Sequence, residues 1–440
     1  MTLFVRHSCL SLVLAVVAAT AAAEAPDPEA AAGYIAERDA ACRADAGQLW
    51  GEPLCAPLLL VDASTRSTVA SQVVDGFAAK GEVFVGTLPK ERNAANTAVD
   101  WNGTRWVMAL WPLPEDAFER RQLLIHESWH AAQDRLGLPA RSPTLAHLAG
   151  LEGRIALRME WRALAAALGA SDDSARKRAI SDALVFRALR RAATVPAREL
   201  ENQLELNEGL AEYTGQRLAG RPEAEAYAAT QLAKHEGDDS FVRSFAYRSG
   251  PAYGLLLDRY GDWRSGLNPD SDLGELLAGK AGVVLPGDTA TAAKQAGARY
   301  GIDAVRADEI GRDLARQRQA ADWTAKLVDR PGLRAPFVAM NISFDPRALF
   351  PLPPHGTVYP TLRVSDQWGI LEANAGALID EAWNQARLPG PGRLRDSDGL
   401  WVGEGWTLKL NPGWTVSEAD GGQILRRVGG ATAGTASRSR

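Results

Sequence analysis

Two histidines stand four residues apart in a stretch whose apolar spacing predicts one helix, residues 116–136. In it the chain reads H-E-S-W-H, from His126 through Glu127 to His130. Four residues advance a helix by about 6 Å and overshoot one turn by about 40°, so both imidazoles project from one face. This spacing constrains the fold more than any other feature, because that face must meet another element that completes what the imidazoles begin.

Imidazoles placed in this way can bind a single metal ion. Neutral imidazole suits Zn²⁺, and a catalytic zinc site has three protein ligands and keeps the fourth position for water. Glu127 lies beside the same helix face, where its carboxylate can accept a proton from that water. The motif therefore predicts a zinc site with Glu127 as general base. The alternative is a chance match on a partly exposed helix.

The third ligand has to come from elsewhere in the chain. Past residue 23 the other histidines do not continue the motif; they are His147, His235 and His355. We expect Glu208, on another predicted helix, to be the third ligand, and Glu205 is the fallback. We expect the neighbouring Asn207 and Glu212 to support the ligands, since a carboxylate one turn along can accept the second ring N–H of a histidine.

An alternative interpretation concerns the same helix. Acidic residues recur along it at helical spacing, at Glu201, Glu205, Glu208 and Glu212. Such a stripe is usually a solvated face. With the two histidines upstream, we instead expect Glu208 to point to the metal.

The organisation of the chain predicts an α+β fold. Strand-like stretches at residues 58–61, 83–85, 97–101 and 104–110 precede the histidine helix, and Asn102-Gly103 predicts a type I′ hairpin turn between the last two. Helical patterns follow at residues 145–168, 174–193, 198–218, 252–260 and 290–328. Residues 329–336, with Pro331 and Gly332, are expected to be a linker to a smaller β-rich domain.

The domains that we expect follow from these patterns. They are a signal peptide at 1–23, a β-rich subdomain at 24–115, a helical metal-binding subdomain at 116–328, a β-rich domain at 337–428 and a disordered tail at 429–440. The signal peptide rests on Arg6, an apolar run at 10–17 and small residues before Glu24. It predicts export to the periplasm or the medium, with an uncleaved anchor as the alternative.

Cysteine usage and charge agree with an exported globular protein. Cys42 and Cys55 can form one disulfide in an oxidising compartment, although two buried thiols would leave the same pattern. The 49 basic and 54 acidic residues give a net charge of -5 without a basic block, which argues against nucleic acid as a partner. No run past residue 23 is long and apolar enough to span a bilayer.

The two metal-binding stretches together resemble the gluzincin metallopeptidases, which include thermolysin-like endopeptidases and zinc aminopeptidases. The matching residues are His126-Glu127-x-x-His130 and Asn207-Glu208-Gly-Leu-Ala-Glu212. The resemblance implies a mainly α, zincin-type domain beneath a small β sheet. It also implies zinc held by the two histidines and Glu208, with Glu127 as base and Glu212 in a supporting position.

A shorter match, Tyr247-Arg-Ser-Gly250, is similar to the Y-x-x-G of zinc aminopeptidases and implies that Tyr247 donates to the reaction oxyanion. Tyr253 and His235 are alternative donors, and a core aromatic is the other interpretation of both tyrosines. The G-x-M-x-N stretch of aminopeptidases is missing, so the resemblance does not extend to exopeptidase specificity. The strand at residues 106–110 is a candidate for pairing with an extended peptide.

The sequence thus predicts an exported zinc metallopeptidase that acts on peptides or proteins. The alternatives are a zinc-stabilised, non-catalytic envelope binding protein and a zinc hydrolase of a non-peptide amide. Residues 24–56 are either a pro-segment or part of the fold, and the sequence leaves the oligomeric state open.

Overall fold

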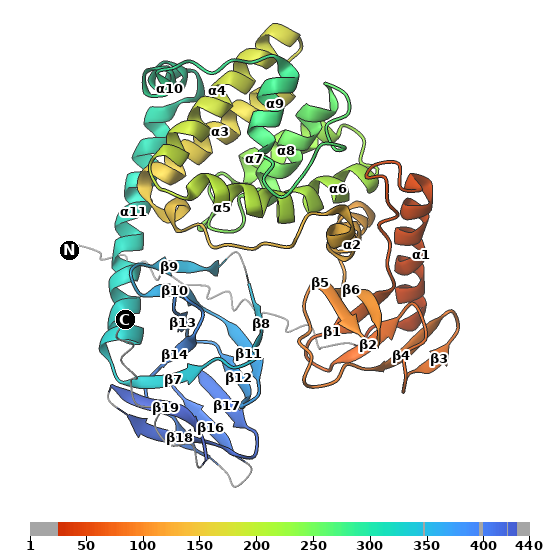
Figure 1. The fold of residues 1–440 in the computed structure, drawn as a ribbon, viewed down its shortest axis with the longest axis vertical. Helices are drawn as coiled ribbons and strands as arrows, with labels where there is room; N and C mark the ends of the chain where they lie inside the picture. Colours follow the sequence, from red (N-terminus) through yellow and green to blue (C-terminus); the bar gives the residue numbers. More distant parts are fainter. Residues whose placement is uncertain (1–24, 346–347, 396–398, 420, 429–440) are drawn as a thin grey trace, which may run out of the picture.

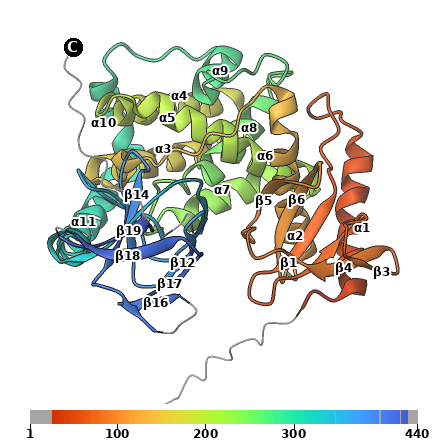
Figure 2. The same ribbon diagram turned by 60° about the horizontal axis from the view of Figure 1, so that its bottom comes forward.

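The computed structural model describes residues 25–345, 348–395, 399–419 and 421–428 (Figure 1). The expected signal peptide at 1–23 and the expected tail at 429–440 lie outside these residues. Helices fill the middle of the chain, with a sheet before them and a β-rich region after them, which confirms the α+β class. Figure 2 shows the two β-rich parts lying beside one another on the same side of the helices.

The N-terminal part is a six-stranded sheet with one helix, α1 (Pro28–Asp45), which the sequence did not predict. The strand order is β3-β4-β2-β1-β6-β5, and β1 and β6 run parallel. At the β5–β6 turn, Asn102 and Gly103 both have positive φ, 51° and 75°, which confirms the hairpin. The strands are β1 (Leu58–Asp62), β2 (Ser67–Ala70), β3 (Ala78–Lys80), β4 (Val83–Thr87), β5 (Thr97–Trp101) and β6 (Thr104–Trp111).

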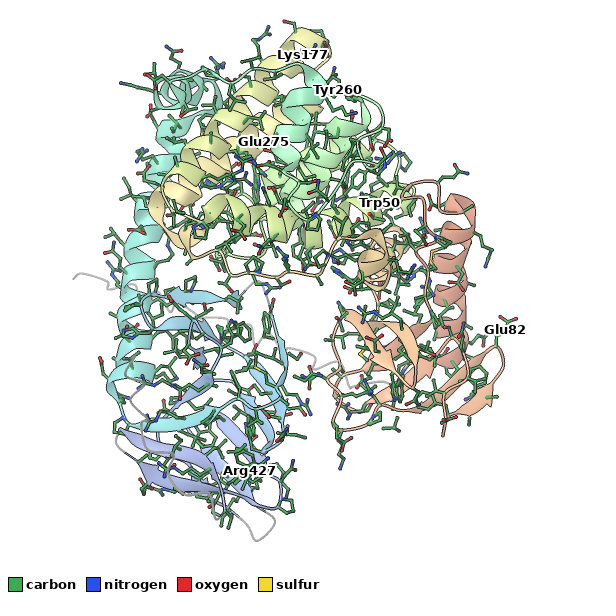
Figure 3. The ribbon with its side chains drawn as sticks, viewed as in Figure 1. Trp50, Glu82, Lys177, Tyr260, Glu275 and Arg427 are labelled. Carbon is green, nitrogen blue, oxygen red and sulfur yellow. A yellow bond between two sulfur atoms is a disulfide. The ribbon has the colours of Figure 1, made fainter. Side chains whose placement is uncertain are left out.

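The end of α1 is tied to the sheet by a disulfide between Cys42 and Cys55, which confirms that pairing. Between these cysteines the chain carries Trp50 into the helical part, as Figure 3 shows. The Trp50 ring lies 4.6 Å from that of Trp129, and its Nε1 donates to Oγ1 of Thr214 across 3.0 Å. Residues 28–56 are therefore built into the fold.

The predicted histidine helix is α2 (Ala117–Ala132), followed by a short 3₁₀ turn, η1 (Gln133–Leu136). Asp116 caps it by accepting a hydrogen bond from the Glu119 amide across 2.9 Å. Leu124 and Ala131 pack into the core of the N-terminal sheet, whereas Trp129 packs among the other helices. Because α2 is buried between two cores, its orientation is fixed from both sides.

The remaining helices form one bundle around α3 and α4, with a continuous apolar core. They confirm the helical middle region, although α8 starts before residue 252 and a turn divides residues 290–328. The elements are η2 (Ala146–Ala149), α3 (Leu151–Leu168), α4 (Asp173–Ala192), α5 (Ala197–Leu204), the π-helical η3 (Glu205–Gly209), α6 (Leu210–Leu218), α7 (Ala224–His235), α8 (Ala246–Asp258), α9 (Leu273–Ala281), α10 (Thr289–Gly297), η4 (Ala298–Tyr300), α11 (Ile302–Thr324) and the π-helical η5 (Ala325–Asp329).

The C-terminal part has two sheets, ordered β18-β19-β7-β14-β13-β10-β9 and β15-β16-β17-β12-β11-β8. Trp368 and Leu371 are among the residues of their common core. The strands are β7 (Gly332–Pro336), β8 (Asn341–Phe344), β9 (Phe350–Leu352), β10 (Gly356–Tyr359), β11 (Leu362–Asp366), β12 (Gly369–Ala373), β13 (Ala377–Ile379), β14 (Gln385–Pro389), β15 (Arg393–Leu394), β16 (Leu400–Gly403), β17 (Trp406–Leu410), β18 (Trp414–Ala419) and β19 (Gly422–Arg427).

The expectation that residues 329–336 form a linker is wrong. Residues 332–336 are strand β7, which pairs with β14 on one side and β19 on the other. Leu333 and Ala335 alternate toward the core and are fully buried. Proline and glycine at the start of the segment masked this short alternation. In the described part of the chain, no helix combines the length and apolar content needed to cross a bilayer.

Candidate metal centre

The two histidines of α2 and a carboxylate from η3 converge on one buried point. The Nε2 atoms of His126 and His130 lie 3.3 Å apart, and each lies 3.5 Å from Oε2 of Glu208. These three side chains form a group that could hold a metal ion. The structure thus brings together the residues in which the sequence predicted a metal site.

The three distances test whether zinc fits this group. Ligand atoms held about 2.1 Å from a tetrahedral zinc ion lie about 3.4 Å from one another. The observed separations of 3.3, 3.5 and 3.5 Å match the edges of such a tetrahedron. Two nitrogen atoms and one oxygen are also a donor set that zinc accepts, so the residues fit the ion.

Glu208 reaches the histidines because its helix changes its winding at that point. The predicted helix at 198–218 is divided into α5, a π-helical turn at Glu205–Gly209, and α6. A π-helical turn holds an extra residue, which rotates the following side chains around the axis, and such turns are frequent at functional sites. Glu208 and Glu212 consequently face α2.

The acidic stripe is neither solvated nor directed to one place. Glu201, Glu205, Glu208 and Glu212 are all buried. Before the π-helical turn, Glu201 and Glu205 pair with arginines of α4; Arg187 binds Glu205 through both Nη atoms. The fallback assignment of Glu205 as a metal ligand therefore finds no support in this geometry, and the interpretation of the stripe as a solvated face is wrong.

The outer ring nitrogen of each histidine has an acceptor of its own. Nδ1 of His126 lies 3.0 Å from Oε2 of Glu212, and Nδ1 of His130 lies 3.1 Å from Oε1 of Gln133. With Nδ1 donating, each Nε2 presents its lone pair to the shared point, as metal binding requires. Glu212 is itself held by Gln122, whose Nε2 donates to Oε1 across 2.6 Å.

Sequence reasoning identified Glu212 but missed both glutamines. Gln122 lies four residues before His126 and Gln133 three residues after His130, so all four share one face of the helix and its 3₁₀ extension. That spacing was the available signal. An uncharged amide at such positions, however, is common on helices and carries no chemistry by itself.

The second oxygen of Glu208 is held by residues near the site. Asn207 Nδ2 donates to Oε1 of Glu208 across 3.1 Å and to Oγ of Ser142 across 2.8 Å. Arg243 brings Nη2 to 3.8 Å from the same Oε1. Asn207 therefore lies in the supporting position expected of it, whereas Ser142 and Arg243 were not foreseen.

Tyr247 lies against the metal ligands. Its hydroxyl donates to Oε2 of Glu208 across 2.7 Å, and its ring stacks on that of His126 at 5.5 Å and 4°. Burial and the neighbouring Glu208 raise the pKa of Tyr247 well above its usual value, so it keeps its proton. The tyrosine is therefore a standing hydrogen-bond donor at the site.

A contact between two glycines makes this approach possible. A Cβ built on Gly250 of α8 would lie 2.2 Å from the Cα of Gly209, and one on Gly209 would lie 3.1 Å from the Cα of Gly250. The two backbones thus touch without side chains between them. The contact sets Tyr247, one turn before Gly250, beside Glu208.

Glu127 is buried next to the histidines with one oxygen unused. Its Oε2 has no hydrogen-bond partner within the described part of the chain. Burial raises the pKa of Glu127 above its ordinary value, although the two histidines oppose this. A buried carboxylate oxygen without a partner is rare and points to a group that binds there in the working protein.

The alternative donors lie in other surroundings. The hydroxyl of Tyr253 donates to Oε1 of Glu160 across 2.7 Å, within the buried arginine and glutamate network. Nδ1 of His235 lies 2.9 Å from Asp238, and Nε2 of His147 lies 2.7 Å from Glu201. Of the three candidate oxyanion donors, the structure brings only Tyr247 to the ligands.

The strand proposed for peptide pairing is also differently placed. β6 pairs with β1 on one side and with β5 on the other, so neither of its edges is available and that hypothesis is wrong. The edge of the sheet next to it is β5. An antiparallel hairpin places either of its strands at the edge, and the sequence did not decide between them.

The chain matches no protein-family model, no curated protein and no solved structure. The functional argument consequently rests on the geometry of the site itself.

Proposed function

We propose that this chain is an exported zinc-dependent metallopeptidase of the gluzincin type. The observation that carries the proposal is the convergence of His126, His130 and Glu208 at separations that suit one tetrahedral zinc ion. Two histidines from an H-E-x-x-H helix and a distant glutamate are the ligands that the resemblance implies. A position left for water favours catalysis over a structural role, because structural zinc is enclosed by four protein ligands.

Zinc held by these residues would polarise the scissile carbonyl and make water nucleophilic at neutral pH. Glu127 accepts the proton of the attacking water and returns it to the nitrogen of the leaving amine. Its unpartnered Oε2 and its place beside both histidines support this role. The base is neutral again only after the peptide C–N bond has broken, so one carboxylate serves both proton transfers.

Tyr247 supplies the hydrogen bond that the developing oxyanion needs. Its hydroxyl exchanges Glu208 for the carbonyl oxygen of the substrate as negative charge grows there. The high pKa of the hydroxyl supports this role, because the phenol then donates a hydrogen bond without losing its proton. Gln122, Gln133 and Glu212 keep the imidazoles oriented throughout.

A peptide substrate is supported by the sheet that adjoins the metal helix. β5 is the edge strand nearest α2, and its free edge can take up an extended backbone by hydrogen bonding. The disulfide between Cys42 and Cys55 supports the proposed export, since such bonds persist in oxidising compartments.

The test is digestion of a mixed peptide library by the purified chain. We expect cleavage that stops with a metal chelator, returns with added zinc and is lost in Glu127→Gln. If the library stays intact while the zinc-loaded chain hydrolyses simple non-peptide amides, the site is a zinc amidase. If neither class of substrate is hydrolysed, the enzyme proposal is wrong.

A further inference from the structure

Strand β8 (Asn341–Phe344) is an edge strand of the C-terminal domain. Among the described residues its one strand neighbour is β11, which pairs with it from Asn341 to Phe344. The other edge of β8 therefore keeps backbone N–H and C=O groups without a strand partner. In Figure 1 this edge is turned toward the N-terminal sheet, below α2.

The first end of β8 touches the loop that leads into β5. Nδ2 of Asn93 donates to Oδ1 of Asn341 across 3.1 Å. Next to this bond, Arg363 of β11 donates to Oδ1 of Asn93, and Ser365 donates to the carbonyl of Glu91 across 3.4 Å. The start of β8 is thus fixed beside the edge strand of the N-terminal sheet.

The second end of β8 reaches the wall of the metal centre. The guanidinium of Arg243 lies 5.4 Å from the centre of the Phe344 ring, while its Nη2 lies 3.8 Å from Glu208. The neighbouring Val242 packs into the core of the C-terminal domain. One side chain consequently lies between the end of β8 and a metal ligand.

These contacts place β8 along the way from the β5 loop to the metal centre. Four residues of extended strand cover about 13 Å. An extended backbone that pairs with β8 would therefore run from the β5 loop toward Glu208. The same path passes the free edge of β5, which lies next to α2 on the other side.

We propose that the free edge of β8 is a docking strand for an extended polypeptide substrate, opposite β5. The inference deepens the proposed function and rests on it. The C-terminal domain then acts in substrate selection, because a chain that binds both edges has to be unfolded over that stretch. Backbone hydrogen bonds carry the affinity in such docking, so the preference for sequence at these positions is weak.

The contacts at the two ends of β8 argue for a single strand as the occupant. Asn93 holds the N-terminal sheet against the start of β8, and the helical part holds its end. A folded partner would have to separate these contacts, whereas one extended strand needs only the edges themselves. A second copy of this chain, bound edge to edge, is the competing occupant and is an outcome of the test.

The experiment places a photo-reactive phenylalanine analogue at Ser343 in the full chain that carries Glu127→Gln. The matched control places it at Ser417 of β18, another edge strand at the far end of the same domain. The probe is a twelve-residue peptide that the wild-type chain cleaves. We expect at least about ten times more peptide adduct at position 343 than at 417, and competition by unlabelled peptide.

The outcomes separate this inference from the proposed function. Equal adduct at both positions, or none at 343 while the wild type cleaves the peptide, overturns the docking strand. Adducts between two copies of the chain at 343, independent of peptide, assign β8 to a dimer interface and overturn it as well. Peptide adduct at 343 in a chain that cleaves no peptide supports docking and sinks the peptidase proposal instead.

A second measurement needs no change in the protein. Methylating one backbone nitrogen of the peptide that pairs with β8 removes one hydrogen bond, which should raise KM about five-fold and leave kcat unchanged. A methylation scan along the peptide should reproduce this at alternate residues, because only every second N–H of a strand faces one neighbour. A scan without that alternation contradicts the docking strand.

Discussion

The hydroxyl of Tyr247 donates to the same carboxylate oxygen of Glu208 that faces both metal-binding histidines. This bond joins α8 to the metal centre and places a protonated phenol where a substrate carbonyl would lie. The relationship gives Tyr247 a role that is separate from holding the metal.

Replacing this tyrosine tests that role. Tyr247→Phe keeps the ring that stacks on His126 and removes only the hydroxyl. We expect kcat to fall about 10²- to 10³-fold, the usual effect of losing one oxyanion donor, with zinc content and KM little changed. Tyr253→Phe is the matched control, and an equal loss of kcat there would remove the special role of Tyr247.

Glu127→Gln tests the general base. The amide has the shape of the carboxylate but cannot take up a proton, so we expect turnover to fall about 10²- to 10⁴-fold while one zinc per chain is retained. Single-turnover hydrolysis and metal analysis of the same sample measure both quantities. Unchanged turnover in this variant would exclude Glu127 as the base.

Glu212 is expected to act on the metal through His126. Glu212→Gln weakens the acceptor of the Nδ1 proton, and loss of such a partner typically lowers metal affinity about 10- to 100-fold. Competition with a chromogenic chelator measures this. Glu199→Gln on α5, whose side chain is exposed, serves as control and should leave the affinity as it is.

The close contact of Gly209 and Gly250 leads to a prediction about packing. Gly250→Ala forces a Cβ against the backbone of Gly209, so we expect a loss of about 3 kcal/mol of stability and lower activity as Tyr247 is displaced. Gly311→Ala on α11 meets no atom within 4 Å and should stabilise by about 0.5 to 1 kcal/mol. Denaturant unfolding of both variants decides the matter, and equal midpoints would contradict the contact.

The buried acidic network predicts how stability depends on pH. Burial alone would raise the pKa of Glu201, but Arg190, His147 and Arg191 hold it well below its usual value of 4.5. A lowered pKa contributes stability that is complete above pH 4.5 and is lost as the pH falls through the folded value. The free energy of unfolding should therefore decrease in acid.

Glu201→Gln tests this dependence. It should cost about 3 to 5 kcal/mol at neutral pH, because Arg190 loses its buried partner, and it should flatten the acid dependence. Chemical unfolding at several pH values measures both effects. A variant as stable as the wild type, with the same slope against pH, would mean that Glu201 is not ionised in the fold.

The parts of the site that were predictable are those with a strong local signal. The spacing of His126 and His130 is a property of one helix, and Asp116 marks where that helix starts. Glu208 was within reach because an acidic residue had to complete the shell. The hairpin at Asn102 was equally local, since its two residues fix their own turn.

What could not be predicted depends on distant contacts. The π-helical turn at Glu205–Gly209 has no sequence signal, yet it decides that Glu208 faces the histidines while Glu205 faces Arg187. Strand β7 is fixed by its neighbours β14 and β19, which lie far along the chain. The supporting glutamines gain their meaning only once the helices have met.

The most direct test of the central claim is the zinc content of the purified chain compared with that of Glu208→Gln. The account predicts one zinc per wild-type chain and a large loss of zinc from the variant, which keeps its helices as judged by circular dichroism. A folded variant that holds zinc as tightly as the wild type would show that Glu208 does not complete the site. A wild-type chain that binds no zinc would contradict the account as a whole.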